Sequence, residues 1–173
     1  KVIEIRKTGF VNKGAELMLY AVLEKMKQEF PDAEFAMEPS EPYFKRAELR
    51  FYQIAQLWRK GFQFGILAKL IPARIRDMYG IVLIEEVDIV IDAAGFSYSD
   101  QLGEYSCVEL ADSCKRWKKN GTKVILLPQA FGPYKSKFNQ KSIKTALDYA
   151  DLVFAREKIS YNYLVKIVGE RPN

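Results

Sequence analysis

The sequence predicts an α/β fold, a doubly wound and Rossmann-like parallel sheet with helices on both faces. Three observations support this class. Short apolar segments of strand length recur along the chain, and their apolar residues stand at consecutive positions, which is typical of strands buried on both faces. Segments with apolar residues at helical spacing separate them. The regular alternation of the two kinds of segment is the pattern of a parallel sheet.

The expected elements follow one another in chain order. Residues 2–6 form the first apolar strand, and a helix follows over residues 13–30, where apolar residues recur at helical spacing. Another helix, over residues 104–119, ends at Asn120-Gly121, a common stop signal. The remaining strands are expected at 34–37, 88–92, 123–127 and 152–155, and the remaining helices at 142–149 and 158–168.

The segment 44–79 does not fit this alternation, because it mixes bulky apolar residues with many basic ones. One interpretation is an irregular helical excursion, over about residues 44–80, that packs on the domain. The other is an interfacial segment that touches an anionic membrane or a lipid-linked glycan, since helices rich in basic and aromatic residues bind such surfaces. The basic residues that support this interpretation are Arg50, Arg59, Lys60, Lys69, Arg74 and Arg76.

Composition restricts the partners. The chain of 173 residues is long enough to bury one self-sufficient core, so a single domain is expected. Its net charge of +5 favours anionic partners such as phosphates, acidic sugars or a membrane surface. The basic residues are spread along the chain instead of gathered in one stretch, which argues against nucleic acid. There is no His and no Cys-x-x-Cys, so no metal site is predicted.

The two cysteines and the hydropathy indicate the compartment. Cys107 and Cys114 would lie about 10 Å apart along a helix, which is farther than a disulfide can close. Two reduced thiols suit a cytoplasmic protein. The chain shows no signal peptide and no apolar run of transmembrane length. Interfacial contact through residues 44–79 would place the protein at the inner face of the membrane.

Ligands of parallel sheets bind beyond the carboxyl ends of the strands, so the loops there are the candidate site. In the first, Gly9 and Gly14 have the spacing of a nucleotide phosphate loop, but Ala15 and Glu16 replace the Lys and Ser/Thr that such a loop needs. Glu16 would also repel a phosphate. The loop is therefore interpreted as a turn in which Asn12 caps the helix and Gly14 admits a close approach, with a plain strand-to-helix turn as the alternative.

The second loop is "DAAGFSYSD", which begins at the last residue of the expected strand 88–92. Gly95 breaks the strand, and Ser97 and Asp100 follow it with a hydroxyl and a carboxylate. Such groups hydrogen-bond to the hydroxyls of a sugar. For Asp100, capping of a helix is the alternative.

The third and fourth loops contribute an amide and a guanidinium. Gln129 lies just past the strand 123–127, and Arg156 directly follows the strand 152–155. Arg156 would present a bidentate donor at the ligand edge of the sheet. The alternative is a surface ion pair with Asp151 or Glu157.

Together, four motifs in these loops resemble the polysaccharide pyruvyl transferase family. Ala15 stands where the family more usually has an acidic residue, and Ala94 where many members have a glycine. The motifs, in the family's order, are Asn12-x-Gly14-x-Glu16, Asp92-x-x-Gly95-Phe96-Ser97, Pro128-Gln129-x-x-Gly132-Pro133 and Arg156-Glu157-x-x-Ser160.

The resemblance implies one half of a two-domain fold like that of the B-type glycosyltransferases. Residues 1–173 would be the amino-terminal domain, and the carboxyl-terminal domain would be absent from the chain. It also implies a transferase of exopolysaccharide biosynthesis that moves a pyruvyl group from phosphoenolpyruvate to a sugar, as a ketal. The acceptor would be an oligosaccharide or a lipid-linked glycan. No cofactor is implied. The general acid suggested by the resemblance is a His outside this chain, so the chain alone is expected to be inactive.

The resemblance also suggests roles. Phosphoenolpyruvate carries a carboxylate and a phosphate, so we expect Arg156 to be the catalytic anion contact. Two other functions remain open, because a fold alone does not carry function. They are a nucleotide-sugar glycosyltransferase domain and a non-catalytic glycan-binding domain. The residues expected to bind substrate are Asn12, Gly14, Glu16, Gly95, Ser97, Asp100 and Gln129, of which Asn12, Glu16, Ser97 and Asp100 would face the acceptor sugar.

Overall fold

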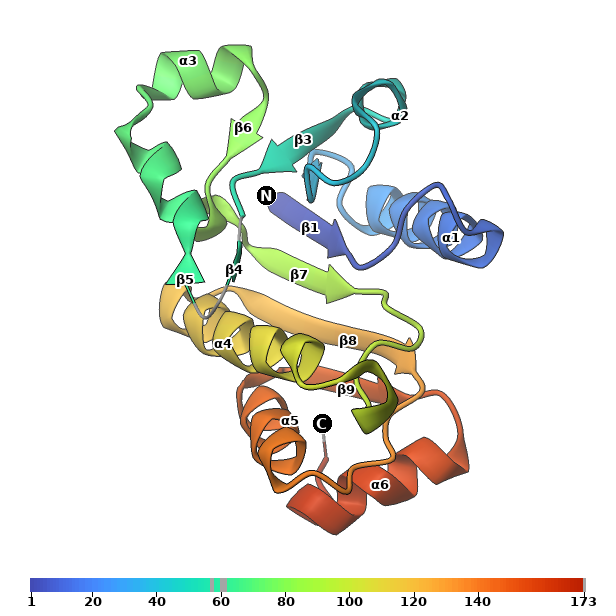
Figure 1. Ribbon diagram of the computed structural model, residues 1–173. Coiled ribbons are helices and arrows are strands. Elements are labelled where there is room, and N and C mark those ends of the chain that lie inside the picture. The colour runs from blue at the N-terminus through green and yellow to red at the C-terminus, as the bar shows by residue number, and fades with distance from the viewer. Residues whose placement is uncertain (57, 60–61, 173) are drawn as a thin grey trace. The chain divides into compact units, whose positions relative to one another are not determined.

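The computed structural model describes residues 1–56, 58–59 and 62–172. Seven strands belong to one sheet, in the order β6-β3-β2-β1-β7-β8-β9, and helices connect them along the chain (Figure 1). Every strand pair of this sheet whose register is described is parallel. The predicted α/β, Rossmann-like parallel sheet is therefore confirmed. The chain divides into two compact units, residues 1–91 and residues 92–173.

The first unit begins with the strand and helix that the sequence predicts. The side chain of Asn12 caps α1, where its Oδ1 accepts hydrogen bonds from the backbone N–H groups of Gly14 (2.8 Å) and Ala15 (3.3 Å). Ile3 and Ile5 of β1 and Leu19 and Leu23 of α1 are buried in the core, and the strand β2 pairs with β1. These elements are β1 (Val2–Arg6), α1 (Lys13–Glu29) and β2 (Glu34–Met37).

The segment expected to be a helical excursion contains one strand of the main sheet, β3, and ends just before another, β6. Phe51 and Ile54 are buried in β3, and the ring of Phe51 packs edge-on against that of Phe35 at 6.2 Å. The strand is hard to recognise because half-buried Tyr52 and Gln53 interrupt its apolar run. Residues 57, 60 and 61 of this segment lie outside the described residues. The elements are α2 (Tyr43–Glu48), β3 (Phe51–Ile54), β4 (Trp58–Arg59), β5 (Phe62–Gln63), η1 (Phe64–Leu70), α3 (Ala73–Met78), β6 (Ile81–Val82) and η2 (Ile84–Glu86).

In the second unit, α4 and α5 pack against each other and β8 pairs with β9. Cys107 and Cys114 are free and buried in α4, as expected from their spacing. Helix α5 begins five residues earlier than expected, because Ser136 caps it and accepts a hydrogen bond from Asn139 N–H (3.4 Å). With β7 (Ile89–Asp92) before them, the elements are η3 (Asp100–Leu102), α4 (Tyr105–Asn120), β8 (Lys123–Gln129), α5 (Lys137–Tyr149), β9 (Leu152–Ala155) and α6 (Lys158–Val168).

Among the residues that the structure describes, none of the helices combines the length and the apolar character that crossing a membrane requires.

Two glycines of the second unit have nearly the same backbone angle but different surroundings, so comparing them distinguishes the cost of backbone strain from the cost of overpacking. Gly121, which ends α4, and Gly132, in the loop after β8, have almost the same positive φ of +81° and +80°. A Cβ at Gly121 would meet nothing within 4 Å, whereas at Gly132 it would lie 2.6 Å from the ring of Tyr163. Gly132 is thus needed both for the backbone angle and for the close packing of the ring.

We expect Gly121→Ala to lower the free energy of unfolding by about 1 kcal/mol, the cost of a left-handed residue with a Cβ. Gly132→Ala should cost about 1–3 kcal/mol more, because the methyl group overpacks against Tyr163. Urea unfolding of the two variants and the wild type measures this difference. Equal losses in the two variants would show that the Tyr163 contact is unimportant.

Candidate functional site

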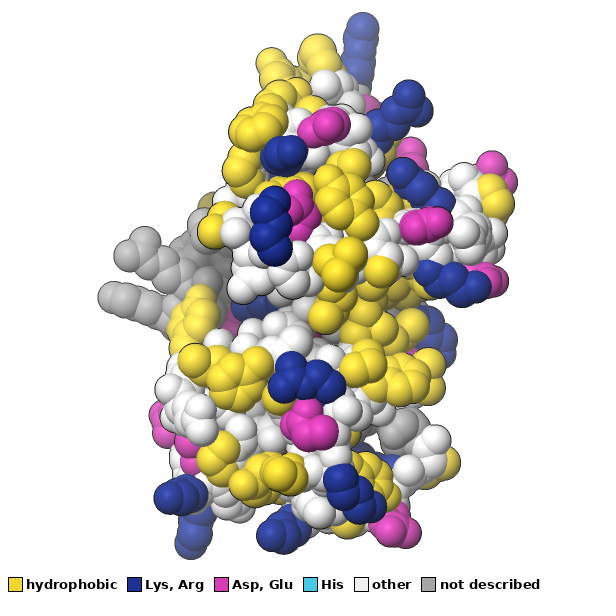
Figure 2. Space-filling view, turned by 90° about the vertical axis from the view of Figure 1, so that its right-hand side faces the viewer, with side chains coloured by type: hydrophobic (Ala, Val, Ile, Leu, Met, Phe, Trp, Pro, Cys, Tyr) yellow, Lys and Arg dark blue, Asp and Glu magenta, His cyan; other side chains and the backbone are white. Residues whose placement is uncertain are grey.

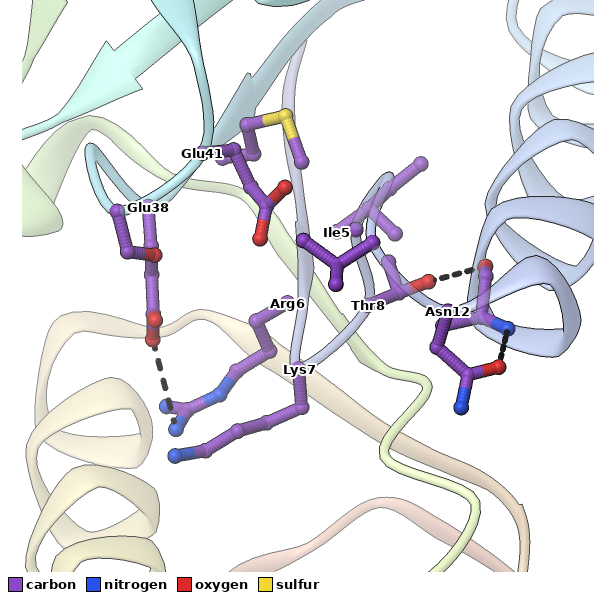
Figure 3. Close-up of a pocket in the computed structure, with 12 residues that line it drawn as sticks. Ile5, Arg6, Lys7, Thr8, Asn12, Glu38 and Glu41 are labelled. Atoms are coloured by element: carbon purple, nitrogen blue, oxygen red, sulfur yellow. Dashed lines mark hydrogen bonds and ion pairs between the residues drawn. The ribbon is translucent and has the colours of Figure 1, made fainter.

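A pocket of about 280 Å³ lies in the first unit, where β1 and β2 end and α1 begins (Figure 3). This is the ligand edge expected of a parallel sheet. Apolar side chains of Ile5, Val11 and Met37 form part of its wall. Its polar side chains are Arg6, Lys7, Thr8, Asn12, Glu38, Ser40 and Glu41.

The basic residues of the pocket come from the end of β1. Arg6 is 1% exposed, and its Nη2 lies 3.8 Å from Glu38 Oε1. Figure 3 shows the side chains of Arg6 and Lys7 extending toward the same side of the pocket. Lys7 has a φ of +57°, a conformation that is uncommon for a residue with a Cβ. Strained residues of this kind gather at functional sites, so Lys7 is a functional candidate.

The carboxylate of Glu41 determines the shape of the pocket. Its Oε2 accepts a hydrogen bond from Phe10 N–H at 3.1 Å. A Cβ at Gly9 would overlap this carboxylate, so only a glycine leaves room for it in this position. On the other side of the loop, the hydroxyl of Thr8 donates to the carbonyl of Ala15 at 2.5 Å. The turn between β1 and α1 is therefore fixed at both ends.

Of the residues predicted in the first loop, the pocket takes in only Asn12. A Cβ at Gly14 would meet only Asn12 Oδ1, at 3.2 Å. Apart from this capping oxygen, no other group of the described chain makes the close approach to Gly14 that the sequence suggested. Glu16 forms an ion pair with Lys13 at 2.7 Å, and the hydrogen bond from Lys13 holds the pKa of Glu16 below its ordinary value. Gly14 and Glu16 are not among the lining residues.

In the second unit, backbone hydrogen bonds join the loops after β7, β8 and β9. The carbonyl of Gly95 accepts from Ala130 N–H (2.8 Å), and that of Tyr98 accepts from Gly132 N–H (3.1 Å). The carbonyl of Gln129 accepts from Arg156 N–H (2.9 Å). The structure thus brings the loops that carry Gly95, half-buried Ser97 and Arg156 together with the end of β8. Gln129 was expected just past its strand, but β8 is two residues longer than expected and Gln129 is its last residue.

A buried carboxylate holds two of these loops. Asp92, the last residue of β7, is completely buried. Its Oδ1 accepts from Ala94 N–H (3.1 Å) and from the amide Nε2 of Gln129 (3.0 Å), and its Oδ2 accepts from the Tyr98 hydroxyl (2.6 Å). Gln129 is also fully buried, so the structure places it in the support of the loops. Its contact with a substrate remains a prediction.

Asp100, the first residue of η3, contacts the backbone that leads into α5, and the sequence allowed a capping role for it. It accepts from the Asn139 side chain (2.8 Å) and from the backbone N–H groups of Ser136 (2.9 Å) and Lys135. Burial alone would raise the pKa of Asp100, but these hydrogen bonds hold it below its ordinary value.

Arg156 forms the ion pair that the sequence left open as an alternative. Its Nε donates to Glu157 Oε2 at 3.0 Å, and its side chain is 56% exposed. Asp151 instead accepts from Val124 N–H (2.9 Å) and from Lys123 (3.0 Å). The role of Arg156 as an anion contact remains a prediction.

Sequence reasoning missed four charged residues of the pocket. Glu38 and Glu41 follow β2 and would have been found by applying the strand-end rule to that strand as well. Arg6 was hidden inside an apolar strand, and the unusual φ of Lys7 has no signal in the sequence.

The sequence of residues 12–169 matches the model of the polysaccharide pyruvyl transferase family. The chain belongs to this family. The matched range contains the four motifs and both pocket glutamates, whereas Arg6 and Lys7 lie before it. No protein with a curated function matches the chain.

The Asp100 cap gives a pH-dependent prediction. Because its pKa is lowered by folding, the carboxylate stabilises the fold above its unfolded pKa of about 3.9 and loses this effect as the pH falls through the lower folded value. We expect Asp100→Asn to lower the free energy of unfolding by about 1–2 kcal/mol at neutral pH, and the difference from wild type to shrink in acid.

Urea unfolding at several pH values measures this effect. Asp32→Asn, at an exposed side chain of the first unit, is the control for the loss of one surface charge. A difference between wild type and Asp100→Asn that stays constant down to strongly acidic pH would contradict the cap.

Proposed function

We propose that the protein transfers a pyruvyl group from phosphoenolpyruvate to two hydroxyls of a sugar in a cell-surface polysaccharide, forming a cyclic ketal. The observation that carries this proposal is the family match over residues 12–169. The reaction would take place in the cytoplasm, where the reduced state of Cys107 and Cys114 is stable.

The reaction sets clear demands on the protein. One sugar hydroxyl adds to the enol carbon that bears the phosphate, while the methylene carbon takes up a proton. The second hydroxyl then forms a bond to the same carbon, and phosphate departs. The two hydroxyl protons are balanced by one proton on the new methyl group and one on the released phosphate. The site must therefore orient two hydroxyls and assist proton transfer.

The charge of the pocket in the first unit favours the acceptor sugar over the donor. Two basic and two acidic side chains line it, so its formal charge is zero. Phosphoenolpyruvate would meet both carboxylates there, whereas a neutral sugar can donate hydroxyl protons to the glutamates and accept from Arg6, Lys7 and Asn12. A volume of about 280 Å³ is close to the lower limit of ordinary ligand pockets and suits a single sugar residue.

Within this pocket, Glu41 is the group best placed to orient and deprotonate an acceptor hydroxyl. The Phe10 N–H fixes one of its oxygens, so the side chain is positioned before a ligand binds. The anion contact to phosphoenolpyruvate is assigned to Arg156, whose guanidinium would exchange its partner Glu157 for the donor.

We expect Glu41→Gln to lower kcat/KM for the acceptor by about tenfold or more, because the amide cannot accept the hydroxyl proton. The measurement is phosphate release from phosphoenolpyruvate with an oligosaccharide acceptor, in the full-length protein that carries these residues. Glu48→Gln, on the exposed side of α2 in the same unit, is the matched control and should leave the rate unchanged.

Two results would contradict the assignment. Equal rates for Glu41→Gln and Glu48→Gln would show that Glu41 takes no part in the reaction. Stabilisation of the protein by a nucleotide sugar and not by phosphoenolpyruvate would favour a glycosyltransferase, and stabilisation by neither donor would favour a non-catalytic glycan-binding domain.

A further inference from the structure

A second and larger groove, of about 610 Å³, lies in the first unit between α2, β3 and the turn that joins α3 to β6. The upper part of Figure 2, at the height of α2 and α3 in Figure 1, shows hydrophobic side chains gathered among Lys and Arg side chains. The side chains that give the groove its chemistry are Tyr43, Arg46, Arg50, Tyr52, Asp77 and Tyr79.

Aromatic rings of this groove are open to solvent. Tyr43 is 75% exposed and Tyr79 is 69% exposed, although large apolar side chains are usually covered. Tyr52 is half-buried, and its hydroxyl donates to Glu34 at 3.4 Å. Tyrosine rings offer a flat apolar face together with a hydroxyl, which matches the apolar faces and hydroxyls of a sugar ring.

One arginine of the groove is held rigidly. Arg46 is 6% exposed, and it donates from Nε to the carbonyl of Glu41 (3.1 Å) and from Nη2 to the side chain of Gln53 (3.2 Å). Its guanidinium also lies over the ring of Tyr43, 5.9 Å from the centroid. Arg46 is therefore held in place before a ligand binds, and the segment that leads from Glu41 to Arg46 connects the groove with the acceptor pocket.

The other arginine is available to a ligand. Arg50 is exposed, and among the residues that the structure describes it forms no ion pair. Its φ is +59°. Among the described residues other than glycine, only Arg50 and Lys7 have a positive φ, and Lys7 lines the acceptor pocket. The groove is lined by two guanidinium groups, of Arg46 and Arg50, and by one carboxylate, of Asp77, so the formal charge of its lining is positive.

We propose that this groove binds an acidic segment of the glycan, one whose sugars carry carboxylates such as the ketal formed in the reaction. The inference rests on the proposed function, because that reaction adds a carboxylate to a sugar that enters without it. A formally neutral pocket suits the unmodified sugar, and a positive, aromatic groove suits the modified one. The chain of the polysaccharide would thus keep a finished repeat in the groove while the next repeat enters the pocket.

An anionic membrane is the less suitable occupant. Interfacial segments present an outward apolar face to the lipid. Exposed apolar side chains do occur in the same segment, such as Leu70 and Met78, but the tyrosine rings of the groove lie beside the polar side chains of Gln53 and Asp77. A membrane therefore serves as a competing outcome of the experiment.

The experiment measures calorimetric binding of a pyruvylated oligosaccharide, and of the same oligosaccharide after acid removal of its ketals, to the full-length protein. We expect Arg50→Gln and Tyr79→Ala each to weaken binding of the pyruvylated form about tenfold, with little effect on the ketal-free form. The wild-type affinity for the pyruvylated form should fall with salt. Arg74→Gln and Tyr20→Ala, at exposed residues of the same unit outside the groove, are the matched controls and should bind like wild type.

The outcomes separate the groove from the reaction. Arg50→Gln should release phosphate at the wild-type rate with a short acceptor. If both Arg50→Gln and Tyr79→Ala released phosphate normally and bound the pyruvylated oligosaccharide like wild type, the groove would not be a glycan-binding site. The proposed function would still stand. Groove-dependent binding without any phosphate release would support the groove and overturn the proposed function. If wild type sedimented with anionic phospholipid vesicles and Arg50→Gln and Tyr79→Ala did not, while both variants bound the pyruvylated oligosaccharide with wild-type affinity, the groove would be a membrane contact. That result would overturn the proposal.

Discussion

Two strands of the sheet end in a charged residue that is removed from water, and the ligand edge of each unit is built around that residue. Arg6 ends β1 at 1% exposure, and Asp92 ends β7 at 0%. A charge in such a position is stable only when polar groups meet it. Glu38 approaches Arg6 from the loop after β2. Tyr98 approaches Asp92 from the loop after β7, and Gln129 approaches it from the end of β8. The polar pocket and the joined loops follow from this requirement.

The sequence is most informative where structure is decided locally. The bounds of β1, β2, β9 and α6 agree with the prediction, since apolar runs and helical spacing are read over a few residues. The capping of α1 by Asn12 was predicted for the same reason. Strand β3 was missed because its place is decided by pairing with β2, where Phe35 stands opposite Phe51, and that contact joins distant parts of the chain.

Strand-end position led to the loop after β1, and Asn12 of that loop lines the pocket. The pocket also contains Glu41 and Lys7, and the side-chain direction of Lys7 depends on a backbone angle that the sequence does not reveal. Charge balance then distinguishes the pocket at the end of β1 from the groove beside α2. The pocket is formally neutral and the groove is positive, as expected if a neutral sugar becomes acidic during the reaction.

The central claim is that the protein moves the three carbons of phosphoenolpyruvate onto a sugar. The most direct measurement is carbon-13 NMR of an oligosaccharide acceptor after incubation with the full-length protein and labelled phosphoenolpyruvate. We predict that the label appears in the acceptor as a methyl group, a carboxylate and a quaternary ketal carbon. An acceptor that stays unlabelled with phosphoenolpyruvate but gains a sugar from a nucleotide-sugar donor would contradict it.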